Sequence, residues 1–393
     1  MKFSVLLPTR NRLDLLQYAV ETVRRQNYEN WEIIISDNDS EQNISGYVEN
    51  LREERIKYYR TNKFISVTDN WNNAIEKASG DYIIMLGDDD CILKNFFSII
   101  SNLVSSFNHP DAIYTKSLLY AYPGAIPGYP NGFIRSYDYA PFFKLSDHPF
   151  ILDRQTARDL VEDSMNFRMT YTYNMQHTIL KHSFIDSLAG KGPFFQSPYP
   201  DFYATNVVFL MAERILISPI PLVVVGISTK SFGHFFFNKD EKGGSEFLNN
   251  LPDLSSFENL RQVLLPGSMD RTSWLFAMET IKQNFGIDHE LRVNYQRYRF
   301  LQVASAYATY FSDRNKKQLM PLLDHLRFYE KIVYTPLAWA YHCMKVLTPL
   351  SLQKSLAHWF MKRIVRTPET EPPSGTNTYR NILDVFDNFP QQT

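Results

Sequence analysis

The stretch DYIIMLGDDD, residues 81–90, decides the fold class of this chain. A short apolar run ends at Gly87, and three consecutive carboxylates follow it: Asp88, Asp89 and Asp90. The apolar run is typical of a strand that is buried on both faces. Three adjacent carboxylates repel one another, so we expect a functional reason for their position at the end of a buried strand.

Strand and helix patterns alternate around this stretch over the first hundred residues. Strands are predicted for four apolar runs, at 3–8, 31–36, 56–60 and 81–86. Helices are predicted where apolar residues recur at helical spacing, at 11–26, 43–54, 67–78 and 95–107. This alternation predicts an α/β fold with a mainly parallel sheet covered by helices on both faces.

Composition restricts the class of protein. The 393 residues exceed what one ordinary core needs, and a hydrophobic fraction of 44% can fill two. The 41 Lys and Arg balance 42 Asp and Glu, which gives no electrostatic reason to expect nucleic acid as a partner. Two distant cysteines, Cys91 and Cys343, build neither a disulfide framework nor a zinc site, and so favour a reducing compartment.

The apolar runs are also short. The first one, at 3–8, is too short for a signal peptide, and none approaches the ~20 residues of a membrane-spanning helix. We therefore expect a cytoplasmic protein.

The three carboxylates suggest a metal site. Ligands of open parallel sheets bind beyond the carboxyl ends of the strands, where Asp88 to Asp90 are predicted to lie. Carboxylate oxygens suit hard divalent ions such as Mg²⁺ or Mn²⁺, which take few protein ligands and fill their remaining positions with water and phosphate. The alternative is an exposed acidic turn that caps the helix beginning near Lys94.

Two other strand ends carry polar residues at the same predicted edge. These residues are Thr9, Arg10 and Asn11 after the first strand, and Asp37, Asn38 and Asp39 after the second. Such side chains can contact a nucleobase or a ribose, although Asp and Asn are equally common in turns and helix caps. Taken together, they predict a nucleotide pocket.

Three segments in this order and spacing resemble family 2 glycosyltransferases of the GT-A fold: FSVLLPTRNR (3–12), WEIIISDNDS (31–40) and GDYIIMLGDDD (80–90). The resemblance implies a GT-A-type nucleotide-diphospho-sugar transferase domain at 1–254, with a nucleotide-sugar-binding half at 1–115 and an acceptor half at 116–254. After about residue 255 the pattern is helical, which predicts a C-terminal helical region at 255–393.

Three later segments have patterns of their own. The apolar segment 214–228 predicts two strands separated by a proline turn, and 229–247 predicts a loop. The segment 379–389 is typical of a short amphipathic helix, which we expect to pack back on the body of the protein.

The resemblance also implies roles for the residues at the sheet edge. Asp88 is expected near the ribose, Asp90 at the divalent metal (Mn²⁺ or Mg²⁺), and Asp89 between them. Pro8, Thr9, Arg10, Asp37, Asn38, Asp88 and Asp89 are the expected contacts of the nucleotide sugar. The family's commoner DDGS is DNDS here (37–40), which leaves open which residue meets the base.

Members of this family invert the anomeric centre, which requires a carboxylate base. The resemblance places this base at the start of a helix, where the sequence has Asp201 after Pro200. The structural alternative is that Asp201 is simply the N-cap of that helix. Asp138 and Asp147 are weaker candidates for the base.

Histidines and tyrosines supply further candidates. His234, in SFGHFFF, is expected as an additional metal ligand, with a packed core residue as the alternative. His177 is interpreted as a buried structural residue in preference to a lining of the acceptor site. Aromatic walls for the sugar acceptor are expected from a set of tyrosines, which could equally form a loop core: Tyr120, Tyr122, Tyr129, Tyr137 and Tyr139.

The C-terminal region contains a basic segment, 331–366, which has no Asp or Glu. A basic, aromatic-bearing helical surface can lie on anionic lipid, at the inner face of the membrane. An ordinary helix pair with a solvated basic face, or a homo-oligomer interface, are the alternatives.

These observations predict a metal-dependent inverting glycosyltransferase. It would move a sugar from a nucleotide-diphosphate donor, with a UDP-sugar favoured, to a glycan or lipid-linked glycan in surface polysaccharide synthesis. One alternative is a sugar nucleotidyltransferase, which would normally have a glycine-rich loop after the first strand; PTRNRLD (8–14) has no glycine. The other is a glycan-binding protein without turnover.

Overall fold

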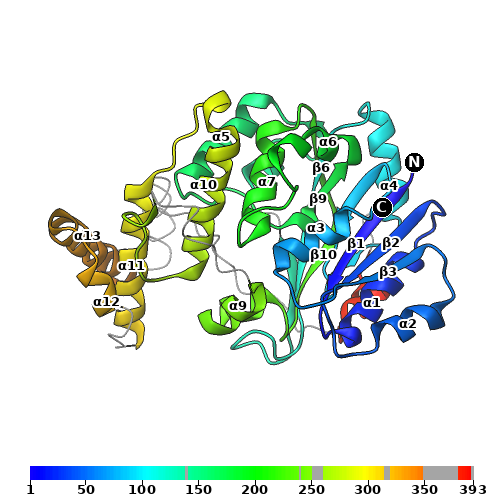
Figure 1. Ribbon diagram of the computed structural model, residues 1–393, viewed down its shortest axis with the longest axis horizontal. Coiled ribbons are helices and arrows are strands. Elements are labelled where there is room, and N and C mark those ends of the chain that lie inside the picture. Colours follow the sequence, from blue (N-terminus) through cyan, green and yellow to red (C-terminus); the bar gives the residue numbers. More distant parts are fainter. Residues whose placement is uncertain (138–139, 239, 250–259, 314–318, 348–378, 391–393) are drawn as a thin grey trace. The chain divides into compact units, whose positions relative to one another are not determined.

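The computed structural model describes residues 1–137, 140–238, 240–249, 260–313, 319–347 and 379–390 (Figure 1). Tyr139, Asp138 and most of the basic segment, from 348 to 366, lie outside these ranges. The chain divides into two compact units. The first consists of Met1–Asp159, Tyr171–Asn250 and Thr370–Thr393, and the second of Leu160–Thr170 and Leu251–Glu369.

The first unit is built on a ten-stranded sheet with the order β3-β2-β1-β4-β9-β6-β10-β5, in which β7 also pairs with β6 and β8 with β10. The strands are β1 (Phe3–Thr9), β2 (Trp31–Asp37), β3 (Ile56–Arg60), β4 (Tyr82–Met85), β5 (Cys91–Ile92), β6 (Ala112–Ala121), β7 (Phe133–Tyr137), β8 (Phe150–Ile151), β9 (Thr178–Lys181) and β10 (Ile215–Ile227). β1 is parallel to β2 and β4, β2 to β3, and β6 to β10, while β9 runs antiparallel between β4 and β6. The predicted α/β architecture with a mostly parallel sheet is confirmed.

The helices of this unit are α1 (Leu13–Arg24), α2 (Ile44–Leu51), α3 (Val67–Ile75), α4 (Phe96–Ser106), α6 (His182–Ser187), α7 (Pro200–Met211), α8 (Phe232–Phe237), α9 (Glu241–Leu248) and α15 (Ile382–Asn388). Helix α5 (Arg154–Met165) runs from the first unit into the second. Three short 3₁₀ helices are η1 (Pro141–Lys144), η2 (Met175–His177) and η3 (Ala189–Lys191).

One apolar cluster joins the sheet to the helices that follow the first strands. Side chains that alternate along β1, such as Val5 and Leu7, are fully buried. Leu16 and Val20 belong to the same cluster, because their spacing puts them on one face of α1. Burial of this stripe fixes α1 on the sheet, and with it the loop between β1 and α1, which carries site residues.

Two predictions for the segment after residue 213 are wrong. Two strands separated by a proline turn were expected at 214–228, but β10 is one strand whose register shifts on both sides of Pro221. A proline removes one ladder hydrogen bond, and a bulge absorbs this loss without ending the strand. The segment 229–247, expected as a loop, forms α8 and α9; Asp240 caps α9 by accepting a hydrogen bond from Gly243 N.

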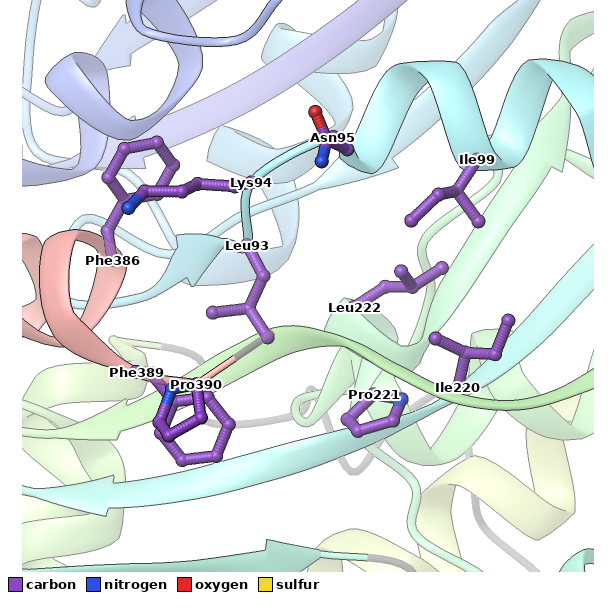
Figure 2. A pocket seen from close by; sticks show the side chains of 10 residues that line it. All are labelled: Leu93, Lys94, Asn95, Ile99, Ile220, Pro221, Leu222, Phe386, Phe389 and Pro390. Carbon is purple, nitrogen blue, oxygen red and sulfur yellow. The ribbon is translucent and has the colours of Figure 1, made fainter. Parts of the chain in front are cut away.

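The C-terminal helix α15 returns to the first unit, as the sequence predicted for 379–389. It packs against α1 and β5, and Figure 1 shows it in red beside α1. Lys94 Nζ donates a hydrogen bond of 2.7 Å to the carbonyl of Asp387. The hollow beneath α15 has a volume of about 60 Å³ and a mostly apolar lining (Figure 2). That is room for one or two water molecules, much less than a nucleotide needs.

The second unit is helical, with α10 (Met269–His289), α11 (Tyr295–Asp313), α12 (Leu319–Asp324) and α13 (Phe328–Leu347). Val303, Leu322 and Ala338 are part of its core, which joins α11, α12 and α13. Within the described ranges, none of the helices has the length and apolarity to cross a bilayer.

A buried ion pair sets the orientation of α13. Arg299 Nη2 donates a hydrogen bond of 2.6 Å to Glu330 Oε2, and Arg299 Nη1 donates to the carbonyl of Val263 at 2.9 Å. Burial favours a raised pKa of Glu330, but the hydrogen bonds from Arg299 and from the Arg327 backbone outweigh it, so the pKa is lowered. The polar residue of the first turn of α13 therefore points into the unit.

We expect Arg299→Met to lower the free energy of unfolding by about 3–5 kcal/mol, because it leaves the Glu330 carboxylate buried without its partner. The double variant Arg299→Met/Glu330→Leu should recover most of this loss. Denaturant titration of the two variants and the wild type measures the difference. A single variant as stable as the wild type would contradict a structural role of the pair.

Candidate active site

The carboxyl ends of β1, β2 and β4 lie along one edge of the sheet, and the predicted site residues follow these ends. Thr9, at the end of β1, is in register with Asp37, at the end of β2. β4 pairs with β1 on its other side as far as Met85, shortly before the three aspartates. The sheet therefore brings together the segments that the sequence assigned to this edge, where ligands of open α/β sheets bind.

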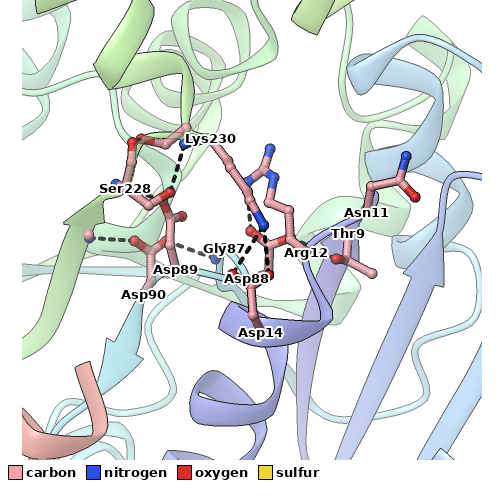
Figure 3. Close-up of polar contacts among 12 residues, drawn as sticks. Thr9, Asn11, Arg12, Asp14, Gly87, Asp88, Asp89, Asp90, Ser228 and Lys230 are labelled. Atoms are coloured by element: carbon pink, nitrogen blue, oxygen red, sulfur yellow. Dashed lines mark hydrogen bonds and ion pairs between the residues drawn. The ribbon is translucent and has the colours of Figure 1, made fainter. Parts of the chain in front are cut away.

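Asp88 is buried between a hydroxyl and a guanidinium (Figure 3). Thr9 Oγ1 donates a hydrogen bond of 2.7 Å to Oδ2, and Arg12 Nη1 donates one of 2.6 Å to Oδ1. Burial raises the pKa of Asp88 to about 6; Arg12 opposes this shift, and Asp89 adds to it. Although burial disfavours the charge of Arg12, the nearby carboxylates hold its pKa above the ordinary value. Arg12 is thus an internal counter-ion of the acidic turn.

Asp90 holds the turn together and attaches it to β10. Its Oδ2 accepts a hydrogen bond of 2.8 Å from Gly87 N, and its Oδ1 accepts one of 2.7 Å from Gly226 N. Burial, increased by the charge of Asp89, raises the pKa of Asp90 well above its ordinary value. Both oxygens of Asp90, the predicted metal ligand, are therefore bound by backbone amides.

Asp89 has a different environment. Its Oδ2 accepts hydrogen bonds from Ser228 N at 3.2 Å and from Ser228 Oγ at 2.8 Å. In the part of the chain that the structure describes, no donor is bonded to Oδ1 of Asp89. Of the three carboxylates, Asp89 is the one that keeps an oxygen for a ligand.

The residues at this turn fit a metal that needs few protein ligands. Among the described residues, no three His, Cys, Asp or Glu side chains form a group that could hold an ion by themselves. Mg²⁺ commonly takes one or two carboxylates from a protein and its other ligands from water and phosphate oxygens. Asp89 can supply one such oxygen, whereas binding to Asp90 would compete with two backbone hydrogen bonds.

At the end of β2, two residues that were predicted to contact the nucleotide make hydrogen bonds within the protein. Asp37 accepts hydrogen bonds from Ser40 N at 3.0 Å and from the Tyr58 hydroxyl at 2.6 Å. Asn38 binds the backbone of Ile65 through both side-chain atoms, each at 2.9 Å. These contacts fold the β2 end and the segment before α3 into one wall.

The residues that reach solvent along this wall are different ones. Asp39 is in the left-handed region with a φ of 55°, and its carboxylate accepts a hydrogen bond of 2.8 Å from Arg60. The Arg10 guanidinium lies 3.7 Å from the ring centroid of Phe64. Pro8, beside Ser36 in the β1–β2 register, is half-buried. Of the acidic and amide residues at 37–39, Asp39 is the one whose side chain is partly exposed.

Asp201 is the second residue of α7, and its carboxylate does not cap the helix. The N-cap is Tyr199, so the structural alternative considered for Asp201 is wrong. Instead, Asp201 Oδ1 accepts a hydrogen bond of 2.7 Å from Met175 N. Burial raises the pKa of Asp201 to about 7, although this hydrogen bond opposes the shift. A carboxyl group with such a pKa can accept a proton near neutral pH.

Aromatic residues of the core lie near Asp201. Burial raises the pKa of Tyr137 to about 12, and the charge of Asp201 contributes to this shift. The Tyr137 ring also contacts His177, with ring centroids 5.3 Å apart. Tyr120 and Tyr122, two of the expected acceptor walls, are buried in the apolar core.

The two histidines have different environments. His177 is fully buried, as predicted: its Nδ1 donates to the Thr115 carbonyl at 2.9 Å, and Nε2 lies 3.1 Å from Ser117 Oγ. Burial lowers its pKa to about 4. His234, on α8, donates from Nδ1 to the Ala125 carbonyl at 2.6 Å. A metal-binding role of His234 stays a prediction.

Comparison with known proteins identifies the part of the chain that forms this edge. Residues 4–148 match the family model described as "Glycosyl transferase family 2". These residues belong to glycosyltransferase family 2. The GT-A-type fold implied by the sequence resemblance is thereby confirmed, and the acidic turn at 88–90 lies inside the family 2 domain.

Two curated relatives align with parts of the family 2 domain. A Campylobacter jejuni protein, GalNAc(5)-diNAcBac-PP-undecaprenol beta-1,3-glucosyltransferase, is 35% identical over 102 residues, which are 25% of this chain and 33% of the relative. UDP-Glc:alpha-D-GlcNAc-diphosphoundecaprenol beta-1,3-glucosyltransferase WfgD of Escherichia coli is 29% identical over 92 residues, 23% of this chain and 36% of the relative. The chain thus spans about a third of the length of each. A solved structure of S. aureus TarS 1-349 in complex with UDP-GlcNAc matches 78% of this chain and 87% of that one, with 16% identity and a TM-score of 0.47.

Sequence reasoning missed three residues of the site. Arg12 was part of the quoted family 2 segment, but its ion pair with Asp88 joins residues that are 76 positions apart in the chain. Gly226 and Ser228 lie near the end of β10, far along the chain from the acidic turn that they bind. Their only signal is their position at the end of an apolar strand, VVVGIS (223–228).

Gly226 offers a test of how the turn is held. A Cβ atom at this position would lie 1.8 Å from the carbonyl oxygen of Asp89. We expect Gly226→Ala to lower the free energy of unfolding by at least about 2 kcal/mol and to weaken UDP binding, because the turn must move away from β10. Gly190→Ala is the control, since a Cβ there meets no atom within 4 Å. Thermal unfolding and UDP titration compare the two variants. Equal effects of the two substitutions would contradict the close contact between the acidic turn and β10.

Proposed function

We propose that this chain is a metal-dependent glycosyltransferase that inverts the anomeric centre of its donor sugar. The donor is a nucleotide-diphosphate sugar, with a UDP-sugar favoured, and the acceptor is a hydroxyl of a glycan or lipid-linked glycan in surface polysaccharide synthesis. The observation that carries the proposal is the buried acidic turn at 88–90, which lies at the carboxyl edge of the sheet in a family 2 domain and leaves one oxygen of Asp89 for a ligand. The undecaprenol-linked substrates in the names of both relatives support the acceptor class.

The donor would bind along the ends of β1, β2 and β4. The partly exposed Asp39 carboxylate and the Arg10–Phe64 stack are suited to contact the nucleobase. Thr9, at the end of β1, donates a hydrogen bond to Asp88, which follows β4, and both are suited to lie near the ribose. Arg12, already paired with Asp88, can also donate to a phosphate oxygen, since a guanidinium has five N–H donors.

Asp89 supports the role of metal ligand better than Asp90 does. A divalent ion held there, when bound, supplies positive charge to the diphosphate and lowers the barrier for its departure. The amide contacts of Asp90 instead fix the turn, so that the free oxygen of Asp89 keeps its direction.

Asp201 is suited to the role of general base. In the transfer step, Asp201 takes the proton of the acceptor hydroxyl, whose oxygen forms the new bond to the anomeric carbon. The bond between that carbon and the diphosphate oxygen breaks at the opposite face, which inverts the centre. The hydrogen bond from Met175 N holds one oxygen of Asp201 and leaves the other for the proton.

Asp201→Asn should lower the transfer rate about 10³-fold and leave metal-dependent UDP binding unchanged, because the amide cannot accept the proton. Asp147→Asn, at the exposed weaker candidate, is the matched control and should transfer at the wild-type rate. Because the base acts in its ionised form and its pKa is about 7, kcat/KM of the wild type should rise with pH through about 7 and then level off. Transfer by the Asp201→Asn variant at the wild-type rate would exclude Asp201 as the base.

The two adjacent carboxylates allow a sharper test of the metal site. Asp89→Ala should make UDP affinity independent of Mn²⁺, at a cost of at least roughly tenfold, or about 1.4 kcal/mol, when Mn²⁺ is present. Asp90→Asn should mainly lower the melting temperature, because its amide nitrogen cannot accept one of the two backbone hydrogen bonds. Calorimetric titration of UDP with Mn²⁺ and with a chelator measures both. A properly folded Asp90→Asn variant that loses the Mn²⁺ effect, with Asp89→Ala retaining it, would reverse the assignment.

A further inference from the structure

Helix α13 has an unusual distribution of side chains: its exposed face is apolar. Of the nine large apolar side chains that are exposed in the described part of the chain, six lie on this helix. They are Phe328, Tyr329, Ile332, Val333, Leu337 and Trp339. Phe328 is 81% exposed, Ile332 57% and Leu337 51%.

These residues form one continuous face. Nine positions recur at intervals of three or four residues and therefore occupy one half of the helix. They are 328, 332, 336, 339 and 343, together with 329, 333, 337 and 340. All of them are exposed, and none carries a charge. Between 328 and 343, Lys331 is the only exposed charged residue among the described side chains. We name the residues 328–343 on this half the apolar face of α13.

The packed side of α13 is polar at its start. Glu330 is fully buried in its pair with Arg299, and Tyr334 and Ala338 pack into the core of the second unit. This is the reverse of an ordinary surface helix, whose apolar stripe faces the core. The buried pair prevents α13 from rotating its apolar face inward, since that would expose Tyr334 and Ala338 and separate Arg299 from Glu330.

We infer that the apolar face of α13 is a surface that binds anionic lipid bilayers. An exposed patch of this extent marks an interaction site. From Lys331 to Pro368 the sequence contains six Lys or Arg and no Asp or Glu: Lys331, Lys345, Lys354, Lys362, Arg363 and Arg366. An apolar helix face in a sequence segment whose charges are all positive matches a bilayer with anionic head groups, where the apolar side chains enter the acyl boundary.

Charge also distinguishes this partner from a second copy of the chain. Two copies that met through the apolar face would bring two exposed Lys331 side chains toward each other, with no exposed acidic residue on the described part of α13 to balance them. Because the opposite side of α13 is packed against α11, only one face is available. A helix with one available apolar face can lie in the plane of a bilayer surface.

Lipid binding does not depend on the proposed transfer reaction, so the two can fail independently. The test uses the full chain in flotation with vesicles of phosphatidylcholine alone and of phosphatidylcholine with phosphatidylglycerol. We expect the wild type to float with the anionic vesicles. The double variant Ile332→Glu/Leu337→Glu should bind them at least tenfold more weakly, because both side chains are exposed and would carry charge into the bilayer.

A matched control is present in the same unit. Ile287, on α10, is 95% exposed but stands apart from the apolar face, so Ile287→Glu should bind vesicles like the wild type. Brominated phosphatidylcholine should quench part of the tryptophan fluorescence of the wild type, and Trp339→Phe should remove that part. Circular dichroism and UDP titration of each variant establish that its fold and nucleotide site are intact.

Three outcomes would overturn the inference: no flotation of the wild type with anionic vesicles, equal flotation of the double variant, or equal weakening by Ile287→Glu. Light scattering without lipid supplies a fourth. If the wild type were a dimer that the double variant dissociates, with no vesicle binding by either, the apolar face would belong to a second copy.

Discussion

The hydrogen bonding of three adjacent carboxylates is the constraint on which the carboxyl edge of the sheet depends. Their mutual repulsion and their burial both disfavour the turn at 88–90. Backbone amides of Gly87 and Gly226, the hydroxyl of Ser228 and the guanidinium of Arg12 compensate for these costs. Three sets of hydrogen bonds thus hold the acidic turn: those within the turn, those from the end of β10, and those from the end of β1 and the loop after it.

This arrangement gives each carboxylate a different part. Asp90 is bound through both oxygens and fixes the turn, whereas Asp88 is paired with Arg12 and Thr9. Of the three carboxylates, Asp89 is the one with an oxygen that no donor of the described residues binds, and its other oxygen is held by Ser228. Three identical residues in a row thus provide a support, an ion pair and, among the described residues, one carboxylate oxygen with no bonded donor, because each meets a different neighbour. An edge held in this way is organised without a ligand, and such preorganisation reduces the cost of binding one.

Asp201 and α13 show the same principle in other parts of the chain. A carboxylate in the first turn of a helix would ordinarily be stabilised in its ionised form. Burial of Asp201 outweighs that effect and moves its pKa to about 7, where a proton acceptor is useful. In α13, the pair of Glu330 with Arg299 reverses the usual polarity of a surface helix and leaves an apolar face exposed. Burial itself in the first case, and a buried ion pair in the second, override what the local sequence pattern predicts.

The sequence by itself determined the α/β class, the parallel strands and the presence of an acidic turn at the end of β4. These follow from local patterns: apolar runs, helical spacing and the residues directly after a strand. Its misses have a common cause, since they depend on residues that are distant in the chain. Partners of Asp89 and Asp90 come from the end of β10. The carboxylate of Asp201 accepts a hydrogen bond from Met175 and does not cap its own helix. Strand β10 continues past Pro221 because its register shifts there at a bulge. Only the tertiary structure decided which of several similar side chains keeps a free oxygen, because a hydrogen bond depends on positions in space that no local spacing specifies.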